Sequence, residues 1–157
     1  HRGGRLVAHV VQRQAGDAER GAPQDHREHE RRQRGERRVR VDSAGRLART
    51  IFRRVKVWPQ ADPPVAVLEA ELETGRTHQI RVHLTHLGFP LAGDLTYGRK
   101  QNAQLEESLA RNVPRQMLHA RLLAFAHPRI KRTMKFEAPL PGDFEGMIEA
   151  LRATTPR

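Results

Sequence analysis

The sequence has 157 residues, a formal net charge of +11 at pH 7 and no cysteine. This length suits one domain with its own core, and the lack of cysteine excludes disulfides, thiol nucleophiles and cysteine-ligated zinc. No run of 18 apolar residues suggests a membrane-spanning helix, and no apolar stretch near the start suggests a secretory signal. Lys and Arg outnumber Asp and Glu by 29 to 18, which favours a polyanionic partner such as nucleic acid. We expect a soluble, cytoplasmic monomer.

The first 37 residues differ in composition from the rest. Residues 1–40 hold eleven arginines, no lysine and six acidic residues, and all seven aromatic residues come after residue 50. Ordering such a segment would cost about 1 to 2 kcal/mol per residue with little apolar burial to offset it. We therefore expect residues 1–37 to be disordered, either as a basic arm that binds RNA or as sequence translated out of frame. The second interpretation is favoured because the chain starts with His1 and its first methionine is Met117.

Folded sequence is expected over 38–157, beginning with strands. The segment "RRVRVDSAGRLARTIFRRVKVW" predicts two strands joined by a turn at "DSAG". In the second of these strands the expected apolar face consists of Leu47, Ile51, Val55 and Val57. The segment "PPVAVLEAELETG" predicts a half-buried antiparallel strand, with alanines and leucines at 66, 68, 70 and 72 on one face and glutamates on the other.

The apolar period then becomes helical. Ile80, Leu84 and Leu87 lie at i, i+4 and i+7, and we expect Thr77 as the N-cap and Gly88 as the C′ residue. Arg81 and His78 then lie together near the helix N-terminus. Cationic donors beside free backbone N–H groups suit an anion or a carboxylate.

The rest of the chain completes an α+β pattern. "GFPLAGDLTYG" predicts a glycine-rich loop, and "QMLHARLLAFAHP" with "RTMKFEAPLP" predicts a hairpin. "GDFEGMIEALR" predicts a final helix with Asp143 as its N-cap and with one apolar face, formed by Phe144, Met147, Ile148 and Leu151. The expected fold class is α+β, with a mixed, mostly antiparallel sheet and short helices.

Several motifs together resemble one enzyme family. "LETGRTHQIRVHLTHLGFPLAGDLTYG", "LHARLLAFAHP" and "FEAPLP" resemble the C-terminal half of the pseudouridine synthases that modify large-subunit rRNA. "GERRVRVDSAGRLART" is most similar to the subgroup called ribosomal large subunit pseudouridine synthase C. The resemblance covers about residues 35 to 152, and "GRTHQIRVH" with "GDLTYG" is its most specific part.

The resemblance implies a reaction, a substrate and candidate site residues. Such enzymes isomerise uridine in structured RNA such as 23S rRNA: an aspartate attacks the nucleoside, and the uracil is detached, rotated and rejoined through C5, without metal or organic cofactor. By correspondence with the "HQIR" motif, Arg81 would pair with that aspartate and keep it ionised, and Ile80 would pack near the base. Arg76, His78 and Arg99 are candidates for phosphate contacts, and Tyr97 for stacking on a base.

One part of the family pattern is missing from the sequence. The nucleophile belongs to an "HRLD" motif and a pocket tyrosine to a "KxYxA" motif, and neither occurs here; the chain opens "HRGGRLVAHV", with Gly4 at the position of the aspartate. We therefore expect a 23S rRNA pseudouridine synthase fragment that is inactive by itself. The alternative is a noncatalytic RNA-binding fragment or pseudoenzyme.

Each candidate residue also has a simpler structural interpretation. His78, His83 and His86 could ligate a metal, but no acidic residue or cysteine lies at ligand spacing, so we expect surface or core-edge histidines and no metal. Asp94 suits a turn cap better than acid–base catalysis. Tyr97 could be a half-buried loop anchor, and Arg81 a structural ion-pair partner.

Overall fold

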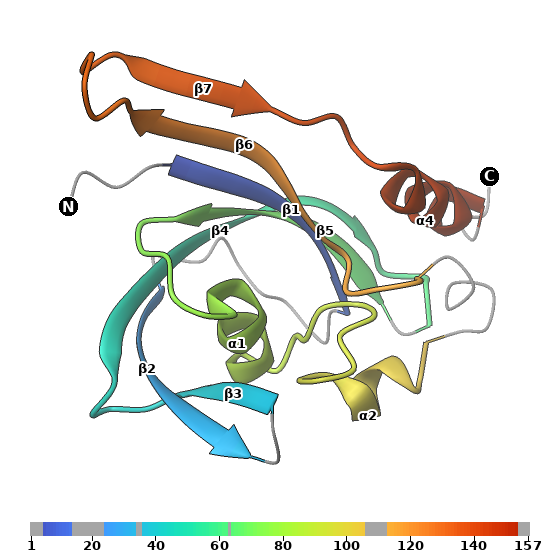
Figure 1. The fold of residues 1–157 in the computed structure, drawn as a ribbon. Coiled ribbons are helices and arrows are strands. Elements are labelled where there is room, and N and C mark those ends of the chain that lie inside the picture. Colours follow the sequence, from blue (N-terminus) through green and yellow to red (C-terminus); the bar gives the residue numbers. More distant parts are fainter. Residues whose placement is uncertain (1–4, 14–23, 34–35, 63, 106–112, 154–157) are drawn as a thin grey trace.

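One seven-stranded sheet organises the fold (Figure 1). The computed structural model describes residues 5–13, 24–33, 36–62, 64–105 and 113–153. The strands are β1 (Arg5–Arg13), β2 (Gln24–Gln33), β3 (Glu36–Val41), β4 (Arg46–Trp58), β5 (Val65–Leu72), β6 (Leu118–Ala126) and β7 (Thr133–Glu137). Their order across the sheet is β3-β2-β4-β5-β1-β6-β7, and all these pairings are antiparallel. With short helices added, the expected α+β class is confirmed.

Two strands, β1 and β2, lie within residues 1–37, the segment that was expected to be disordered. β1 lies between β5 and β6, and β2 lies between β3 and β4. The composition of the whole segment hides the short apolar run "LVAHVV" inside β1, which pairs with β5 on one side and with β6 over Arg5–Val10 on the other. β2 pairs with β4 over Gln24–Glu28 and with β3 over Glu28–Gln33, so hydrogen bonds to neighbouring strands hold both segments in the sheet. Residues 14–23 and 34–35 lie outside the described part, and the domain boundary at residue 38 stays a prediction.

The buried face of β4 is not the one expected. The turn at "DSAG" is present, with the Gly45 amide donating to the Asp42 carbonyl at 3.0 Å, but β2 separates β3 from β4 in the sheet. Ala48 and Thr50 are fully buried, whereas Leu47 and Val55 are 49% and 56% exposed. The expected set was therefore wrong for these two residues, since α1 packs over the face that carries Ala48 and Thr50.

β5 is buried on both faces over most of its length, not half-buried as predicted. Val65 and Val67 pack with Trp58 and the final helix, while Ala66, Leu68 and Ala70 pack on the other face with α1. The two faces alternate because successive side chains of a strand point in opposite directions. The expected pattern of glutamates describes only the last part of the strand.

Three helices are described around the sheet: α1 (Gln79–His86), the single turn α2 (Arg99–Asn102) and α4 (Gly142–Ala153). In Figure 1, β2, β3 and β4 curve around α1, and α4 lies at the far end of the sheet from the β6–β7 turn. The predicted hairpin is β6–β7, and the predicted final helix buries Phe144, Met147 and Leu151. The expectation of Asp143 as the N-cap was wrong, since α4 begins at Gly142 and Asp143 lies inside its first turn. No helix of the described residues is long and apolar enough to span a membrane.

Candidate active site

The site starts where β5 passes into α1. His78, not Thr77, is the N-cap residue, and it has a left-handed backbone with φ of 55°. A histidine in this region is uncommon and strained. At the other end Gly88, with φ of 87°, follows the C-cap residue Leu87, as predicted.

Arg81 and Asp94 form the central contact of the site. Arg81 Nε donates to Asp94 Oδ2 at 2.7 Å and Nη2 donates to Oδ1 at 2.8 Å, a bidentate pair. The Asp94 side chain is fully buried and that of Arg81 is 13% exposed. Asp94 Oδ1 also accepts the backbone N–H groups of Thr96 and Tyr97. The expected turn cap is therefore present, and the same carboxylate holds the arginine.

Electrostatics keep both partners charged. Burial raises the pKa of Asp94, but hydrogen bonds from Arg81 and from the Tyr97 and Thr96 amides outweigh it, so that the pKa of this carboxyl lies below its usual range. The hydrogen bond to Asp94 raises the pKa of Arg81, against the effect of burial. The pair therefore stays ionised over the physiological range.

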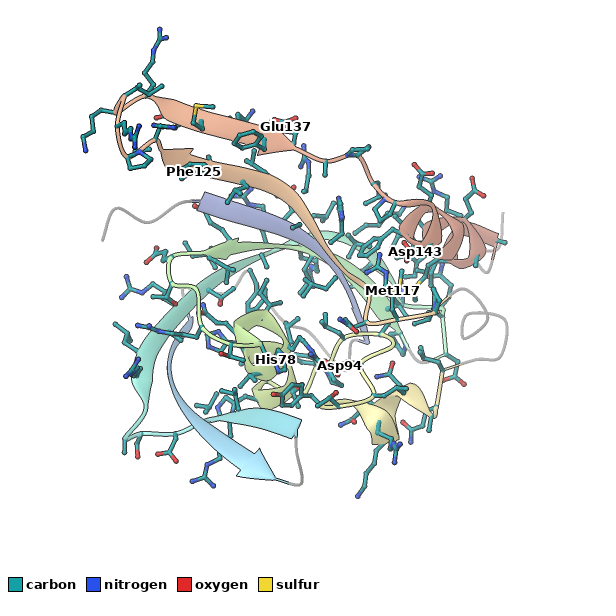
Figure 2. All side chains as sticks on the ribbon, in the orientation of Figure 1. His78, Asp94, Met117, Phe125, Glu137 and Asp143 are labelled. Atoms are coloured by element: carbon teal, nitrogen blue, oxygen red, sulfur yellow. The ribbon has the colours of Figure 1, made fainter. Side chains whose placement is uncertain are left out.

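Tyr97 joins the pair to the helix start and to β3. The Arg81 guanidinium carbon lies 5.0 Å from the centre of the Tyr97 ring, and the His78 ring meets the same ring edge-on. The tyrosine hydroxyl accepts the Val39 amide at 3.0 Å and shares a hydrogen bond of 3.0 Å with His78 Nδ1. Figure 2 shows His78 of the helix start and Asp94 of the following loop in the same part of the fold. These contacts hold the ring of Tyr97 in place, and its stacking on a base stays a prediction.

Gln79 fixes the β5–α1 loop from inside, a role that the sequence did not reveal. Its side-chain oxygen accepts the Thr74 hydroxyl at 2.7 Å and the Arg76 amide at 3.0 Å. Its nitrogen donates to the Arg49 carbonyl and to the Thr50 hydroxyl, both at 2.9 Å. All these bonds come from one buried side chain, so Gln79 sets the position of the helix start against β4.

A second network shapes the loop that carries Asp94. Asn102 Oδ1 accepts the Gly93 amide at 2.7 Å, and its nitrogen donates to the carbonyls of Leu91 and Gly98 at 2.9 Å. Gly93 has φ of 75°, and an added Cβ would lie 2.0 Å from the Arg115 carbonyl oxygen. The turn residues "GDLTYG" could be recognised in the sequence, but their partner Asn102 could not.

The other candidate residues lie in different surroundings. Arg76 is exposed in the β5–α1 loop, where its Nε donates to the Leu47 carbonyl at 3.4 Å, and Arg99 is exposed at the start of α2. Ile80 is 5% exposed and packs in the core cluster around Leu68 and Leu84. Its proposed contact with a base stays a prediction, as do the phosphate contacts of Arg76, His78 and Arg99.

The helix histidines do not converge. His83 is fully buried, with Nδ1 sharing a hydrogen bond of 2.9 Å with the Thr50 hydroxyl, whereas His86 is exposed. His78 faces Tyr97. No group of three or more histidines, cysteines or acidic residues among the described residues could hold a metal ion.

The Arg81–Asp94 pair predicts acid sensitivity of the fold. A carboxyl whose pKa is lower in the folded state stabilises that state fully above its unfolded pKa of about 3.9, and this contribution is lost as the pH falls through the folded value. We expect the free energy of unfolding, measured with urea between pH 6 and pH 2, to fall more steeply for the unchanged chain than for Asp94→Asn. Glu137→Gln is the control: the hydrogen bond with Lys135 also lowers the pKa of Glu137, but both side chains are exposed and solvent screens the pair, so this substitution should change the slope less than Asp94→Asn does. Equal slopes for the unchanged chain and Asp94→Asn would contradict this expectation.

Comparisons with known proteins agree with the resemblance. A family model described as RNA pseudouridylate synthase matches residues 4–86. An uncharacterized RNA pseudouridine synthase of Chloroflexus aurantiacus is 42% identical over 115 residues, which cover 73% of this chain and 33% of that protein. The ribosomal large subunit pseudouridine synthase D of Pasteurella multocida is 48% identical over 92 residues, which cover 55% of this chain and 28% of that protein. The chain thus spans about a third of the length of these relatives.

The fold is also found among solved structures. Human RNA Pseudouridylate Synthase Domain Containing 1 superposes with a TM-score of 0.68 at 22% identity, covering 98% of this chain and 67% of that one. Human RNA Pseudouridylate Synthase Domain Containing 4 gives a TM-score of 0.65 at the same identity. At this identity the likeness concerns the fold alone.

Proposed function

Because this chain belongs to the RNA pseudouridylate synthase family, we propose that it forms the part of a 23S rRNA pseudouridine synthase that positions the catalytic aspartate and binds the RNA. The reaction is the isomerisation of a uridine within structured RNA, with no metal or organic cofactor. Several similar relatives are named ribosomal large subunit pseudouridine synthase D. They favour that subgroup over the C subgroup expected from the sequence.

The observation that carries the proposal is the buried pair of Arg81 and Asp94. A guanidinium has five N–H donors, and Asp94 takes one on Nε and one on Nη2. The remaining donors suit a second carboxylate, that of the nucleophilic aspartate, which they would hold ionised and aimed. Asp94 is then a positioning residue that acts through Arg81, and Tyr97 fixes the guanidinium from its ring face.

We propose that the 157 residues by themselves do not catalyse the reaction. No "HRLD" motif occurs in them, and the attacking oxygen must reach within about 3 to 3.5 Å of the reacting carbon, so the nucleophile needs a carboxylate held at one position and not merely an acidic residue somewhere in the chain. The second candidate function is a noncatalytic RNA-binding fragment. It is favoured by the same missing motif together with the net charge of +11.

Pseudouridine formation in unmodified 23S rRNA tests the proposal. We expect none from the chain as given, and turnover from a longer chain in which a segment with an "HRLD" motif precedes β1. In that longer chain Arg81→Lys keeps the charge but loses the bidentate geometry, so we expect kcat to fall by about a hundredfold or more with a smaller change in KM.

Arg121→Lys is the matched control, because Arg121 is exposed and pairs with Glu69 on the sheet surface. It should leave kcat within about twofold. Melting temperatures of both variants separate loss of catalysis from loss of folding. Turnover by the chain as given, or an unchanged kcat for Arg81→Lys in the longer chain, would show that the proposed roles are wrong.

A further inference from the structure

The turn between β6 and β7 carries a group of cations that the proposed site does not use. Arg129, Lys131 and Arg132 are exposed side chains within six residues of chain, between the end of β6 and the start of β7. Within the part of the chain that the structure describes, no ion pair involves any of the three. We call these three residues the basic tip.

The backbone of this turn is held in one arrangement. The His127 amide donates to the Arg132 carbonyl at 2.8 Å, and the Lys131 amide donates to the His127 carbonyl at 3.0 Å. His127 Nδ1 accepts the amides of Arg129 and Ile130 at 3.3 and 3.4 Å. Lys131 has φ of 56°. The cations are therefore displayed from a turn whose backbone is held by internal hydrogen bonds, and an ordered backbone loses less entropy on binding than a flexible one.

The basic tip lies at the same end of the strands as the β5–α1 connection, where the candidate site starts. Leu6 is opposite Leu72 of β5 on one side and Leu123 of β6 on the other, and Leu123 is opposite Phe136 of β7. After Leu72 the chain runs from β5 into the loop that carries Arg76 and then into α1. After Leu123 it runs to the end of β6 and into the basic tip. Figure 1 shows the β6–β7 turn and the β5–α1 connection at the same end of the strands, on the left of the view.

A stacked aromatic pair with one exposed ring lies close to the basic tip along the hairpin. The rings of Phe125 and Phe136 are stacked, with centres 6.0 Å apart and planes 19° from parallel. Phe136 is 51% exposed, and its cross-strand neighbour Leu123 is 43% exposed. An open aromatic face beside cations is the combination that holds single-stranded RNA, since bases stack on the ring while phosphates meet the charges.

We propose that the basic tip binds RNA phosphates beyond the target nucleotide, and that Phe136 stacks on an unpaired base next to them. This inference rests on the proposed function, because it takes RNA as the partner. RNA is favoured by charge complementarity and by the position of the tip at the same end of the strands as the β5–α1 connection. The hairpin is then a second contact that helps to hold the RNA while the nucleotide occupies the site.

A binding experiment with matched variants tests the inference. The tip variant is Arg129→Gln, Lys131→Asn and Arg132→Gln; asparagine is chosen because it tolerates the left-handed backbone at 131. The control variant is Arg54→Gln, Lys56→Gln and Arg152→Gln, which removes the same charge from exposed positions on β4 and α4. The affinity for a labelled single-stranded segment of 23S rRNA is measured by fluorescence anisotropy across a range of salt concentrations.

We expect the tip variant to bind at least about tenfold more weakly at physiological salt, and its plot of log K against log salt to become shallower by about 2, since each phosphate contact contributes about 0.7 to 0.9 to the slope. The control variant should lose less than about threefold. A charge-preserving variant, Arg129→Lys with Arg132→Lys, should keep the slope, and Phe136→Ala should weaken binding without changing it. Circular dichroism checks that each variant folds.

Two results would overturn the inference in different ways. Equal losses for the tip and control variants would show that only net charge matters, and the proposed function would stand. Absence of salt-dependent RNA binding by the unchanged chain would overturn the proposed RNA-binding function and this inference with it.

Discussion

Arg81→Ala is expected to lower the free energy of unfolding by about 3 to 5 kcal/mol, because it leaves the carboxylate of Asp94 buried without its charged partner. The Thr96 and Tyr97 amides still donate to Asp94 Oδ1, but they do not neutralise its charge. The measurement is urea unfolding at pH 7.

A double-mutant cycle with Asp94→Asn isolates the pair. We expect the double variant to lose less free energy of unfolding than the sum of the losses of the two single variants. Each single variant leaves one buried charge without its partner, whereas the double variant leaves none. Arg53→Ala is the control, because the Arg53 side chain is 69% exposed and pairs with Glu69 at the surface. It should cost less than about 1 kcal/mol. Additive losses in the cycle would contradict a coupled buried pair.

Gly93→Ala is expected to destabilise the fold by more than about 3 kcal/mol, or to prevent folding. The new Cβ would lie 2.0 Å from the Arg115 carbonyl oxygen and 2.7 Å from its carbon, and backbone atoms cannot move aside as a flexible side chain does. The φ of 75° adds strain for any residue with a Cβ. Thermal unfolding followed by circular dichroism measures the effect.

Two other glycines separate the causes. Gly88 has φ of 87° but open space around it, so Gly88→Ala should show only the backbone strain, about 1 kcal/mol. Gly75 has neither a positive φ nor a close neighbour, and Gly75→Ala should change stability by less than about 0.5 kcal/mol. If Gly93→Ala were as mild as Gly88→Ala, the close approach of the Asp94 loop to Arg115 would be wrong.

Local patterns sufficed for the elements whose signals lie within a few residues. The helical spacing of Ile80 and Leu84 predicted α1, and Gly88 predicted where it ends. The alternation of apolar residues predicted the hairpin, and helical spacing predicted the final helix. The motif "GRTHQIRVH" likewise identified the family. Each of these depends on neighbours along the chain, which a single sequence displays directly.

The partners of these residues came only from the tertiary structure. Asp94 follows Arg81 by 13 positions, and no periodicity relates the two; Gln79 reaches back to Thr50, and Tyr97 to the amide of Val39. β1 lies between β5 and β6, far from both in sequence, so composition could not reveal its place. The sequence by itself determined the family, the main helices and the turn residues, because these depend on local spacing. The structure decided which strand faces are buried and that Asp94 holds Arg81, because packing and pairing join segments whose separation along the chain carries no local signal.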